Sequence, residues 1–357
     1  MSEEVFEAEV RRIFFRQWTF VGHESQLADP GDYIVDEVAG ESFIVVRDRT
    51  GVLHAFLNTC RHRGYRFCEE AQGTVGRFVC PYHQWTYGLD GRLVHVPGSV
   101  DGCHLDYADW GLHRAHVEAW HGLVFVCLAE SPPAPLTPAL ESLAADMVPA
   151  RPEHLREAFR ESYDVDANWK VLLENYLECY HCRGQHPELC GSMALDAMYA
   201  TTEGWDGPYL GGATPLKQGH KTMSRDGGLV SKPLGDYADL DELPDGLGGG
   251  FVIVPLLSRL ICHADHMVAH VLRPVDVGRS RWETRWYVAA DAVEGVDYDV
   301  EELTAVWRAT NGQDIPLCEG TYRGVLSRRF VPGPLHPERE YAVRAALDLY
   351  GELMADA

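Results

Sequence analysis

Two short pairs of metal-ligating residues constrain this chain more than any other feature of the sequence. Cys60 and His62 are separated by one residue, and Cys80 and His83 by two. Short β-like runs separated by Gly/Asp turns surround both pairs, so each pair is expected in a loop beside a strand. The region from residue 31 to about residue 126 is therefore predicted to be a small all-β unit. The strands expected in it are Ser42–Arg47, Leu53–Leu57, Arg77–Val79 and Leu123–Leu128.

The composition of the two pairs indicates an iron–sulfur cluster rather than a zinc site. Two cysteines and two histidines match a Rieske [2Fe–2S] centre, where thiolates hold one iron and imidazoles hold the other. A structural zinc also takes two Cys and two His, but zinc modules usually pair Cys with Cys and His with His. The remaining alternative is that these residues bind no metal, and that core cysteines and surface histidines fall at this spacing by chance.

The residues around these pairs resemble a known family. The stretch Cys60–Cys68 reads CRHRGYRFC, and Phe78–Arg92 reads FVCPYHQWTYGLDGR. Both resemble the Rieske domain of the oxygenases that hydroxylate aromatic rings and related substrates. By that resemblance Cys60, His62, Cys80 and His83 bind the cluster, whereas Cys68 is a packed residue near it.

A second candidate metal site lies in the segment from Asn168 to Pro187. A helix is predicted over Trp169–Cys182, and on it Glu174, Glu178 and His181 share one face at i, i+4 and i+7. His186 would point elsewhere on an unbroken helix, but Gly184 and Pro187 supply a break that lets it turn back. Two imidazoles brought together are two-thirds of a facial triad for Fe(II).

The third ligand of such a triad should be a carboxylate, and Asp314 is the candidate. Leu303, Trp307, Thr310 and Asp314 recur at helical spacing along a mostly apolar stripe. Burying an ionised carboxylate costs on the order of several kcal/mol unless a nearby cation compensates its charge. That cation would be a metal ion or, as the alternative, Arg308 or Lys170 in an ion pair.

The second segment also resembles the same oxygenase family, which implies roles for its residues. By that resemblance His181, His186 and Asp314 bind the catalytic iron. Glu178 is then the acidic residue that links a cluster histidine to an iron-binding histidine across a subunit boundary. Motifs such as Glu174–Cys182 (ENYLECYHC) resemble the members that oxidise betaines such as glycine betaine, stachydrine and carnitine.

A trimethylammonium group prefers an aromatic cage, through cation–π attraction. The sequence offers Trp205, Tyr209 and Phe251 for such a cage, and His266 as a further substrate contact. The Gly-rich region 201–250 shows no obvious cage motif. A hydroxylase or demethylase of an aromatic compound or a natural product therefore stays open as an alternative.

Composition excludes several other functions. Lys and Arg number 31 against 54 Asp and Glu, which gives a net charge of −23. Such an acidic surface repels nucleic acids and anionic membranes. Neither a signal peptide nor an apolar run of membrane-spanning length is apparent. Ten cysteines in an unsecreted chain are more often free or metal-bound than paired, so we expect a cytoplasmic location.

These observations combine into one expectation for the fold class, which is α+β. Residues 1–38 form an N-terminal helical segment that packs on the catalytic domain, residues 39–150 the Rieske domain, and residues 151–357 the catalytic domain. The catalytic domain is expected to have a helix-grip fold, an antiparallel sheet wrapped on a long helix. Its strands include Phe251–Pro255, Met267–Arg273 and Arg281–Ala289, and its helices Val300–Thr310 and Glu338–Met354.

The expected function is that of a Rieske-type monooxygenase using O2, a [2Fe–2S] cluster and one mononuclear Fe(II). The glycine-rich segment Gly246–Gly250 precedes a strand and does not open a helix, so no flavin or nicotinamide site is apparent. Electrons must then come from a separate NAD(P)H-dependent reductase that carries flavin or iron–sulfur groups. We also expect a cyclic homotrimer, in which neighbours exchange electrons head to tail. A non-catalytic Rieske electron carrier is the alternative from another class.

Overall fold

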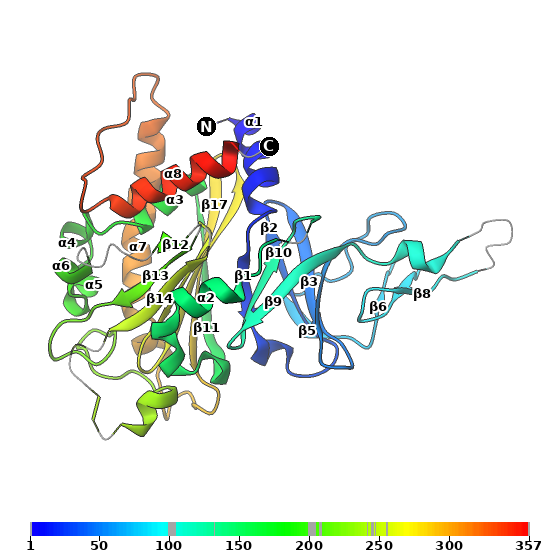
Figure 1. Cartoon of the computed structure of the whole chain (residues 1–357), viewed down its shortest axis with the longest axis horizontal. Helices are drawn as coiled ribbons and strands as arrows, with labels where there is room; N and C mark the ends of the chain where they lie inside the picture. The colour runs from blue at the N-terminus through cyan, green and yellow to red at the C-terminus, as the bar shows by residue number, and fades with distance from the viewer. Residues whose placement is uncertain are drawn as a thin grey trace. The chain divides into compact units, whose positions relative to one another are not determined.

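The chain forms two compact units in the computed structural model (Figure 1). The structure describes residues 2–98, 105–131, 133–198, 205–206, 209–240, 242–243, 246, 248–254 and 256–355. One unit comprises residues 14–134, and the other comprises residues 1–13 together with residues 135–357. We call them the N-terminal unit and the catalytic unit.

The N-terminal unit is all-β. Its larger sheet has seven strands in the order β1-β10-β9-β4-β3-β2-β5, and a smaller sheet has the order β6-β7-β8. Every pairing in both sheets is antiparallel. The strands are β1 Thr19–His23, β2 Asp32–Val38, β3 Glu41–Arg47, β4 Leu53–Leu57, β5 Gln72–Thr74, β6 Phe78–Val79, β7 Thr86–Tyr87, β8 Leu93–His95, β9 Arg114–Trp120 and β10 Leu123–Cys127.

The four strands expected in this unit are all present, with bounds within about one residue. The helical segment expected at the N-terminus is confined to the first residues of the chain. Helix α1 (Glu3–Glu9) passes into a π-helical turn, Val10–Phe14, and the chain then enters β1. Phe20 lies in β1, is fully buried and packs edge-on against Phe125 of β10.

The catalytic unit contains a seven-stranded antiparallel sheet in the order β11-β17-β16-β15-β14-β13-β12. The three strands predicted from the sequence are present in this sheet, and Pro255, the last residue of one of them, lies outside the described residues. The long central strands β16 and β17 are buried over most of their length, which fits a sheet covered by helices. The strands are β11 Leu155–Val165, β12 Trp205–Asp206, β13 Tyr209–Thr214, β14 Gly249–Val254, β15 Ser258–Cys262, β16 Met267–Asp276 and β17 Arg279–Ala289.

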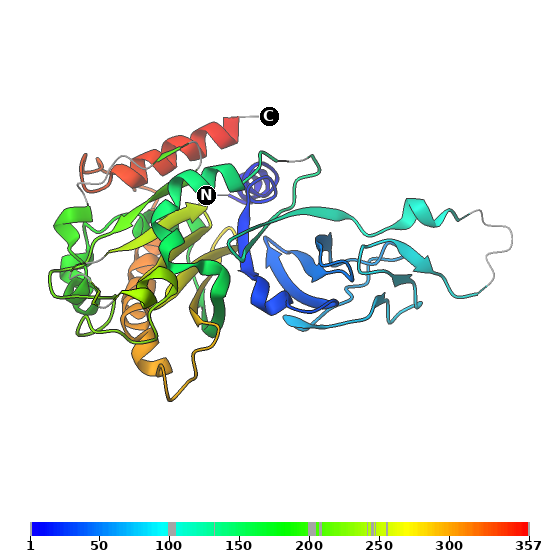
Figure 2. The ribbon, with the colours of Figure 1, turned by 60° about the horizontal axis from the view of Figure 1, so that its bottom comes forward.

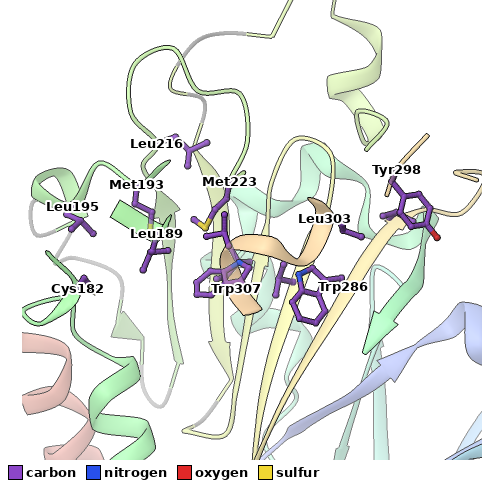
Figure 3. Packing of buried hydrophobic residues seen from close by; sticks show 14 of the residues in the cluster. Cys182, Leu189, Met193, Leu195, Leu216, Met223, Trp286, Tyr298, Leu303 and Trp307 are labelled. Atoms are coloured by element: carbon purple, nitrogen blue, oxygen red, sulfur yellow. The ribbon is translucent and has the colours of Figure 1, made fainter. Parts of the chain in front are cut away.

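Helix α7 (Val300–Val325) packs over one face of this sheet (Figures 1 and 2). Its apolar stripe, including Leu303 and Trp307, joins Trp286 of β17 in a buried hydrophobic cluster (Figure 3). This arrangement is the expected antiparallel sheet wrapped on a long helix. The other helices are α2 Thr137–Leu143, α3 Trp169–Tyr176, α4 Cys182–Gln185, α5 Pro187–Ser192, α6 Leu195–Met198 and α8 Tyr341–Ala355.

A buried carboxylate joins α1, α3 and α8 at the start of α3. Glu9 is fully buried, and its two oxygens accept hydrogen bonds from Trp169 Nε1 at 2.8 Å and the Tyr350 hydroxyl at 2.7 Å, and from the ammonium of Lys170. A buried charge satisfied in this way holds its partners in one geometry. The network therefore fixes the beginning of the helix that leads to the second candidate metal site.

Helix α3 is shorter than the sequence predicted. It ends at Tyr176, and the chain continues through a turn before α4 begins at Cys182. The expectation that Glu174, Glu178 and His181 share one helix face is therefore wrong. Glu174 is exposed, whereas Glu178 and His181 lie in the turn after the helix.

The two compact units do not coincide with the predicted domain ranges, since the N-terminal unit comprises residues 14–134 and the predicted Rieske domain residues 39–150. Residues 14–38 belong to the N-terminal unit, because β1 pairs with β10 and β2 pairs with β3 and β5. Residues 1–13 group with the catalytic unit through the Glu9 network. The domain boundaries at residues 38 and 150 stay a prediction. Among the described helices, none combines the length and the apolar character needed to cross a membrane.

Candidate metal centres

The two Cys/His pairs of the N-terminal unit lie in loops of the same backbone design. The Cys60 N–H donates to the Tyr65 carbonyl at 2.8 Å, and the Cys80 N–H donates to the Trp85 carbonyl at 2.9 Å. Each loop closes with a second bond from the residue four positions on, Gly64 or Gln84, to the cysteine carbonyl. Both of these residues adopt positive φ, 74° and 58°, which turns the chain sharply back.

This shared loop design brings the four side chains together. The rings of His62 and His83 lie 4.6 Å apart, and His62 stacks on Trp85 at 4.8 Å. Both cysteines are almost fully buried, and burial, with the nearby Cys60 thiol, raises the pKa of the Cys80 thiol. The hydroxyl of Tyr87 lies 3.5 Å from Cys60 Sγ, at hydrogen-bonding distance for a sulfur.

The donor set fits a Rieske cluster. Nδ1 of His83 is buried and has no hydrogen-bond partner among the described residues, as a ligand nitrogen should be before its metal binds. Burial and the neighbouring His62 and Arg63 lower the pKa of His83. Two thiols and two imidazoles on paired loops can hold the two irons of such a cluster.

The second candidate site brings together one oxygen and two nitrogens in the catalytic unit. Nε2 of His181 and Nε2 of His186 lie 3.1 Å apart, and Oδ1 of Asp314 lies 3.2 Å and 3.1 Å from them. Two ligands bound at right angles with bonds of about 2.1 Å are roughly 3.0 Å apart. The nearly equilateral triangle therefore fits three ligands on one face of a single metal ion.

Neighbouring groups orient both imidazoles toward this triangle. The Nδ1–H of His181 donates to Glu178 Oε1 at 2.5 Å, and the Nδ1–H of His186 donates to Gln313 Oε1 at 2.8 Å. Gln313 is itself held by its amide N–H to Glu188 Oε2 at 2.9 Å. These acceptors fix the tautomer that turns both Nε2 atoms inward, the usual arrangement for metal-binding histidines.

The protonation of the three groups responds to their close approach. Burial alone would lower the pKa of His181, but hydrogen bonds to Asp314 and Glu178 outweigh it and raise that pKa to about 10, so a metal that binds Nε2 must displace a proton from it. Burial would raise the pKa of Asp314, yet the two histidines hold it below its ordinary value. Asp314 is thus the ionised carboxylate that a divalent metal needs.

The competing interpretations of Asp314 fail in the structure. Arg308 pairs with Glu161 and Lys170 pairs with Glu9, so neither of these cations forms an ion pair with Asp314.

Cys182 is a further candidate ligand, because it is close to the two histidines and the ligand atoms of these three residues lie within 4.8 Å of one another. However, its hydrogen bond to Cys179 and its burial raise the pKa of the Cys182 thiol, which disfavours the thiolate form that binds metals.

A cavity opens beside the triangle, and its walls differ from the sequence-based prediction. Among the described residues, Asn175, Tyr176, Arg259 and Trp307 are part of its lining, together with the three candidate ligands and Glu178. Neither Tyr176 nor Arg259 was predicted from the sequence to line this cavity. Arg259 has no motif around it, and only the pairing of β15 with β14 and β16 brings it here.

The four residues predicted to contact substrate occupy other positions. Trp205 pairs with Leu210 at the sheet edge, and its side chain lies outside the described part of the chain. Tyr209 is buried in β13, and Phe251 of β14 contacts Arg259. His266 is fully buried in the turn between β15 and β16, where its Nδ1 lies 2.7 Å from Asp265 Oδ1. Their substrate roles stay predictions.

The fold and the two donor sets define a class of enzyme. An all-β unit with paired Cys/His loops precedes a sheet-and-helix unit with two histidines and a carboxylate, as in Rieske-type non-haem iron oxygenases. Residues 17–107 match the Rieske [2Fe-2S] domain family, and residues 152–356 match the catalytic domain of the ring hydroxylating alpha subunit family. The chain belongs to this family of iron-dependent oxygenases, which use O2, a Rieske cluster and a mononuclear iron.

Several characterised relatives share most of the chain. The glycine betaine monooxygenase oxygenase subunit of Pseudomonas aeruginosa is 35% identical, over 99% of this chain and 87% of that protein. The carnitine monooxygenase oxygenase subunit of Escherichia coli is 35% identical over 62% of this chain and 59% of that protein. The crystal structure of the quaternary ammonium Rieske monooxygenase CntA has the same fold, with a TM-score of 0.79, 24% identity, and coverage of 99% of this chain and 93% of that one.

The contact between Gln313 and His186 generates a prediction about iron affinity. Gln313→Leu removes the acceptor for the Nδ1–H of His186, which frees the ring to rotate and leaves a buried donor unsatisfied. We expect iron affinity to fall roughly 10- to 100-fold, the usual effect of losing such a partner. Iron content after dialysis against graded chelator measures this loss. Gln218→Leu, at an exposed position, is the control. Equal iron retention by both variants would contradict the orienting role.

Proposed function

We propose that this enzyme is the oxygenase component of a system that hydroxylates and thereby N-demethylates a quaternary ammonium compound of the betaine class. In this proposal Cys60, His62, Cys80 and His83 hold the cluster, and His181, His186 and Asp314 hold the catalytic iron. The observation that carries it is the triangle of Nε2, Nε2 and Oδ1 atoms, 3.1–3.2 Å on each side, at the wall of a cavity with aromatic lining.

The chain's own residues prepare the site for this chemistry. When bound, the iron activates O2 with electrons that the cluster supplies. His181, His186 and Asp314 would hold this iron at the wall of the cavity, next to the space that a substrate can enter. The Asn175 amide N–H donates to Asp314 Oδ1 at 3.2 Å and holds the carboxylate in place.

Two findings support a quaternary ammonium substrate. The relatives described above act on glycine betaine and carnitine, as their names state, and the first covers nearly the whole chain. The rings of Tyr176 and Trp307 line the cavity beside the triangle, where they can attract a trimethylammonium group through cation–π contacts. Hydroxylation of an N-methyl carbon would give an N-hydroxymethyl ammonium, which loses its hydroxyl proton and breaks its C–N bond to release formaldehyde and the tertiary amine.

The system needs partners that supply electrons. We propose a separate NAD(P)H-dependent reductase and a homotrimer as the working assembly, in the cytoplasm. Support for a multicomponent system comes from the relatives, which are named as oxygenase subunits. A solved structure of the similar quaternary ammonium Rieske monooxygenase gave insights into inter-subunit electron transfer in that protein.

Substrate-dependent O2 uptake tests this function directly. Purified enzyme with a reductase should consume O2 and release formaldehyde when glycine betaine is added, and should contain about three irons for every two sulfides. Cys60→Ser should lose the visible cluster spectrum, whereas Asp314→Ala should keep that spectrum and lose turnover. Turnover in Asp314→Ala would remove this residue from the ligand set. Uptake with an aromatic compound but none with betaines would favour an aromatic hydroxylase instead.

Glu178 has a separate role in this proposal as a link between subunits. Its Oε1 accepts from His181 Nδ1, and its Oε2 accepts from the Tyr180 and His181 backbone N–H groups. Its neighbour Tyr180 is 53% exposed, so this turn lies at the surface of the catalytic unit. We propose that a cluster histidine of the adjacent subunit completes the link to Glu178 in the trimer.

Glu178→Gln tests the link and the trimer together. Glutamine keeps the length and one acceptor but loses the charge, so both metals should remain while coupling to the neighbouring subunit weakens. In a single turnover with chemically reduced cluster, product should fall roughly a hundredfold, which corresponds to about 3 kcal/mol on the barrier. A structural role predicts iron loss instead, which metal analysis detects. Normal product from the fully metallated variant, or a monomer by light scattering, would contradict the proposal.

A further inference from the structure

Arg259 on β15 lines the cavity beside the triangle of His181, His186 and Asp314, and its guanidinium lies near two aromatic rings. Its central carbon lies 4.9 Å from the ring centre of Tyr176 and 5.0 Å from that of Phe251. Cation–π contacts of this kind restrain the side chain without neutralising its charge. The planar fork is therefore presented in a fixed orientation.

No carboxylate forms an ion pair with Arg259 within the part of the chain that the structure describes. Arg259 forms no ion pair there, and its Nε is buried without a hydrogen-bond partner. Two carboxylates, Glu178 and Asp314, line the same cavity, but Glu178 accepts the Nδ1–H of His181 and Asp314 Oδ1 lies 3.2 Å from His181 Nε2 instead. By contrast, Arg308 also lies over a ring, that of Phe159, and is paired with Glu161.

An unpaired guanidinium in a cavity raises the free energy of the folded protein unless an anion pairs with it. Removing an arginine from water without a partner costs several kcal/mol (order of magnitude), so such residues are normally paired. Acidic side chains are abundant in this chain, with 54 Asp and Glu, yet this arginine is left without one among the described residues. The surroundings of Arg259 are those of a residue whose partner is a ligand.

Further donors border the same region. The indole N–H groups of Trp282 and Trp307 are buried and have no acceptor among the described residues, and tryptophan can only donate. Trp307 lines the cavity at the iron triangle, and Trp282 lies with Arg259 and Tyr176 around an adjoining cavity. Figure 3 shows Trp307 on α7 near Leu189 and Met193, which belong to the same cavity wall.

We propose that Arg259 binds an anionic group of the substrate, most simply a carboxylate, and so selects zwitterionic betaines over simple quaternary ammonium compounds. This inference rests on the proposed function and extends it to the second charge of the substrate. The carboxylate end pairs with the guanidinium fork, and the ammonium end with its methyl groups lies toward Trp307 and the iron triangle. A fork-to-carboxylate pair of this kind adds both affinity and orientation.

Three matched small molecules separate the two charges of the substrate. Glycine betaine has a trimethylammonium group and a carboxylate. Choline keeps the ammonium group but replaces the carboxylate by an alcohol. The third molecule, 3,3-dimethylbutanoate, keeps the carboxylate and the shape of glycine betaine but replaces the nitrogen by carbon. Calorimetric titration of each into the iron-loaded enzyme measures binding without any turnover.

Arg259→Gln is the informative variant, and Arg259→Lys is its conservative counterpart. In the wild type, glycine betaine should bind roughly thirtyfold or more tightly than choline, the usual effect of a desolvated charge pair. Arg259→Gln should remove that difference and leave choline nearly unchanged. Arg259→Lys should retain part of the difference, because it keeps the charge and loses the fork. Arg308→Gln, whose arginine lies outside the cavity lining, is the control and should behave as the wild type.

The possible results distinguish this inference from the proposed function. An unchanged betaine-to-choline ratio in Arg259→Gln would overturn the role of Arg259 and leave the quaternary ammonium substrate intact. Binding of 3,3-dimethylbutanoate as tight as that of glycine betaine, and lost in Arg259→Gln, would support Arg259 but contradict the ammonium selectivity. If no ligand binds to the wild type, both proposals fall. If Arg259→Gln does not fold, the ratio of glycine betaine affinity to choline affinity is measured on Arg259→Lys instead.

Discussion

The approach of the Asp314 carboxylate to His181 and His186 is the interaction on which the catalytic unit depends. Its Oδ1 lies 3.1–3.2 Å from both Nε2 atoms, although it is on a helix whose other residues at this spacing are mostly apolar. Ionised and largely buried, it requires a positive centre. The alternative cations, Lys170 and Arg308, pair with Glu9 and Glu161. Among the described residues, the two histidines and a metal that they can share therefore compensate the charge of Asp314.

The neighbouring structure is arranged to hold this geometry. Helix α7 packs on the sheet through Leu303 and Trp307, which places Asp314 on the side of the helix that faces the α3–α4 turn. The end of α3 at Tyr176 lets the chain reverse, and Glu178 then reaches the far nitrogen of His181.

The sequence was sufficient for features that depend on local spacing. The Cys/His pairs, the two histidines and the stripe ending at Asp314 could all be found because each is a short motif or a periodic pattern. The end of α3 was missed, since Glu174–Tyr176 and the residues after them have ordinary helix propensity. Arg259 was missed for another reason: its position depends on the register of β15 with β14 and β16, which joins residues far apart in the sequence.

Anomalous diffraction from crystals of the metallated enzyme, recorded at the iron absorption edge, tests the central claim most directly. We predict one peak about 2.1 Å from Nε2 of both His181 and His186 and bonded to the Asp314 carboxylate. We predict a second, two-iron peak among Cys60, His62, Cys80 and His83. An iron bound through Cys182 in place of Asp314, or a signal at the zinc edge alone, would contradict these assignments.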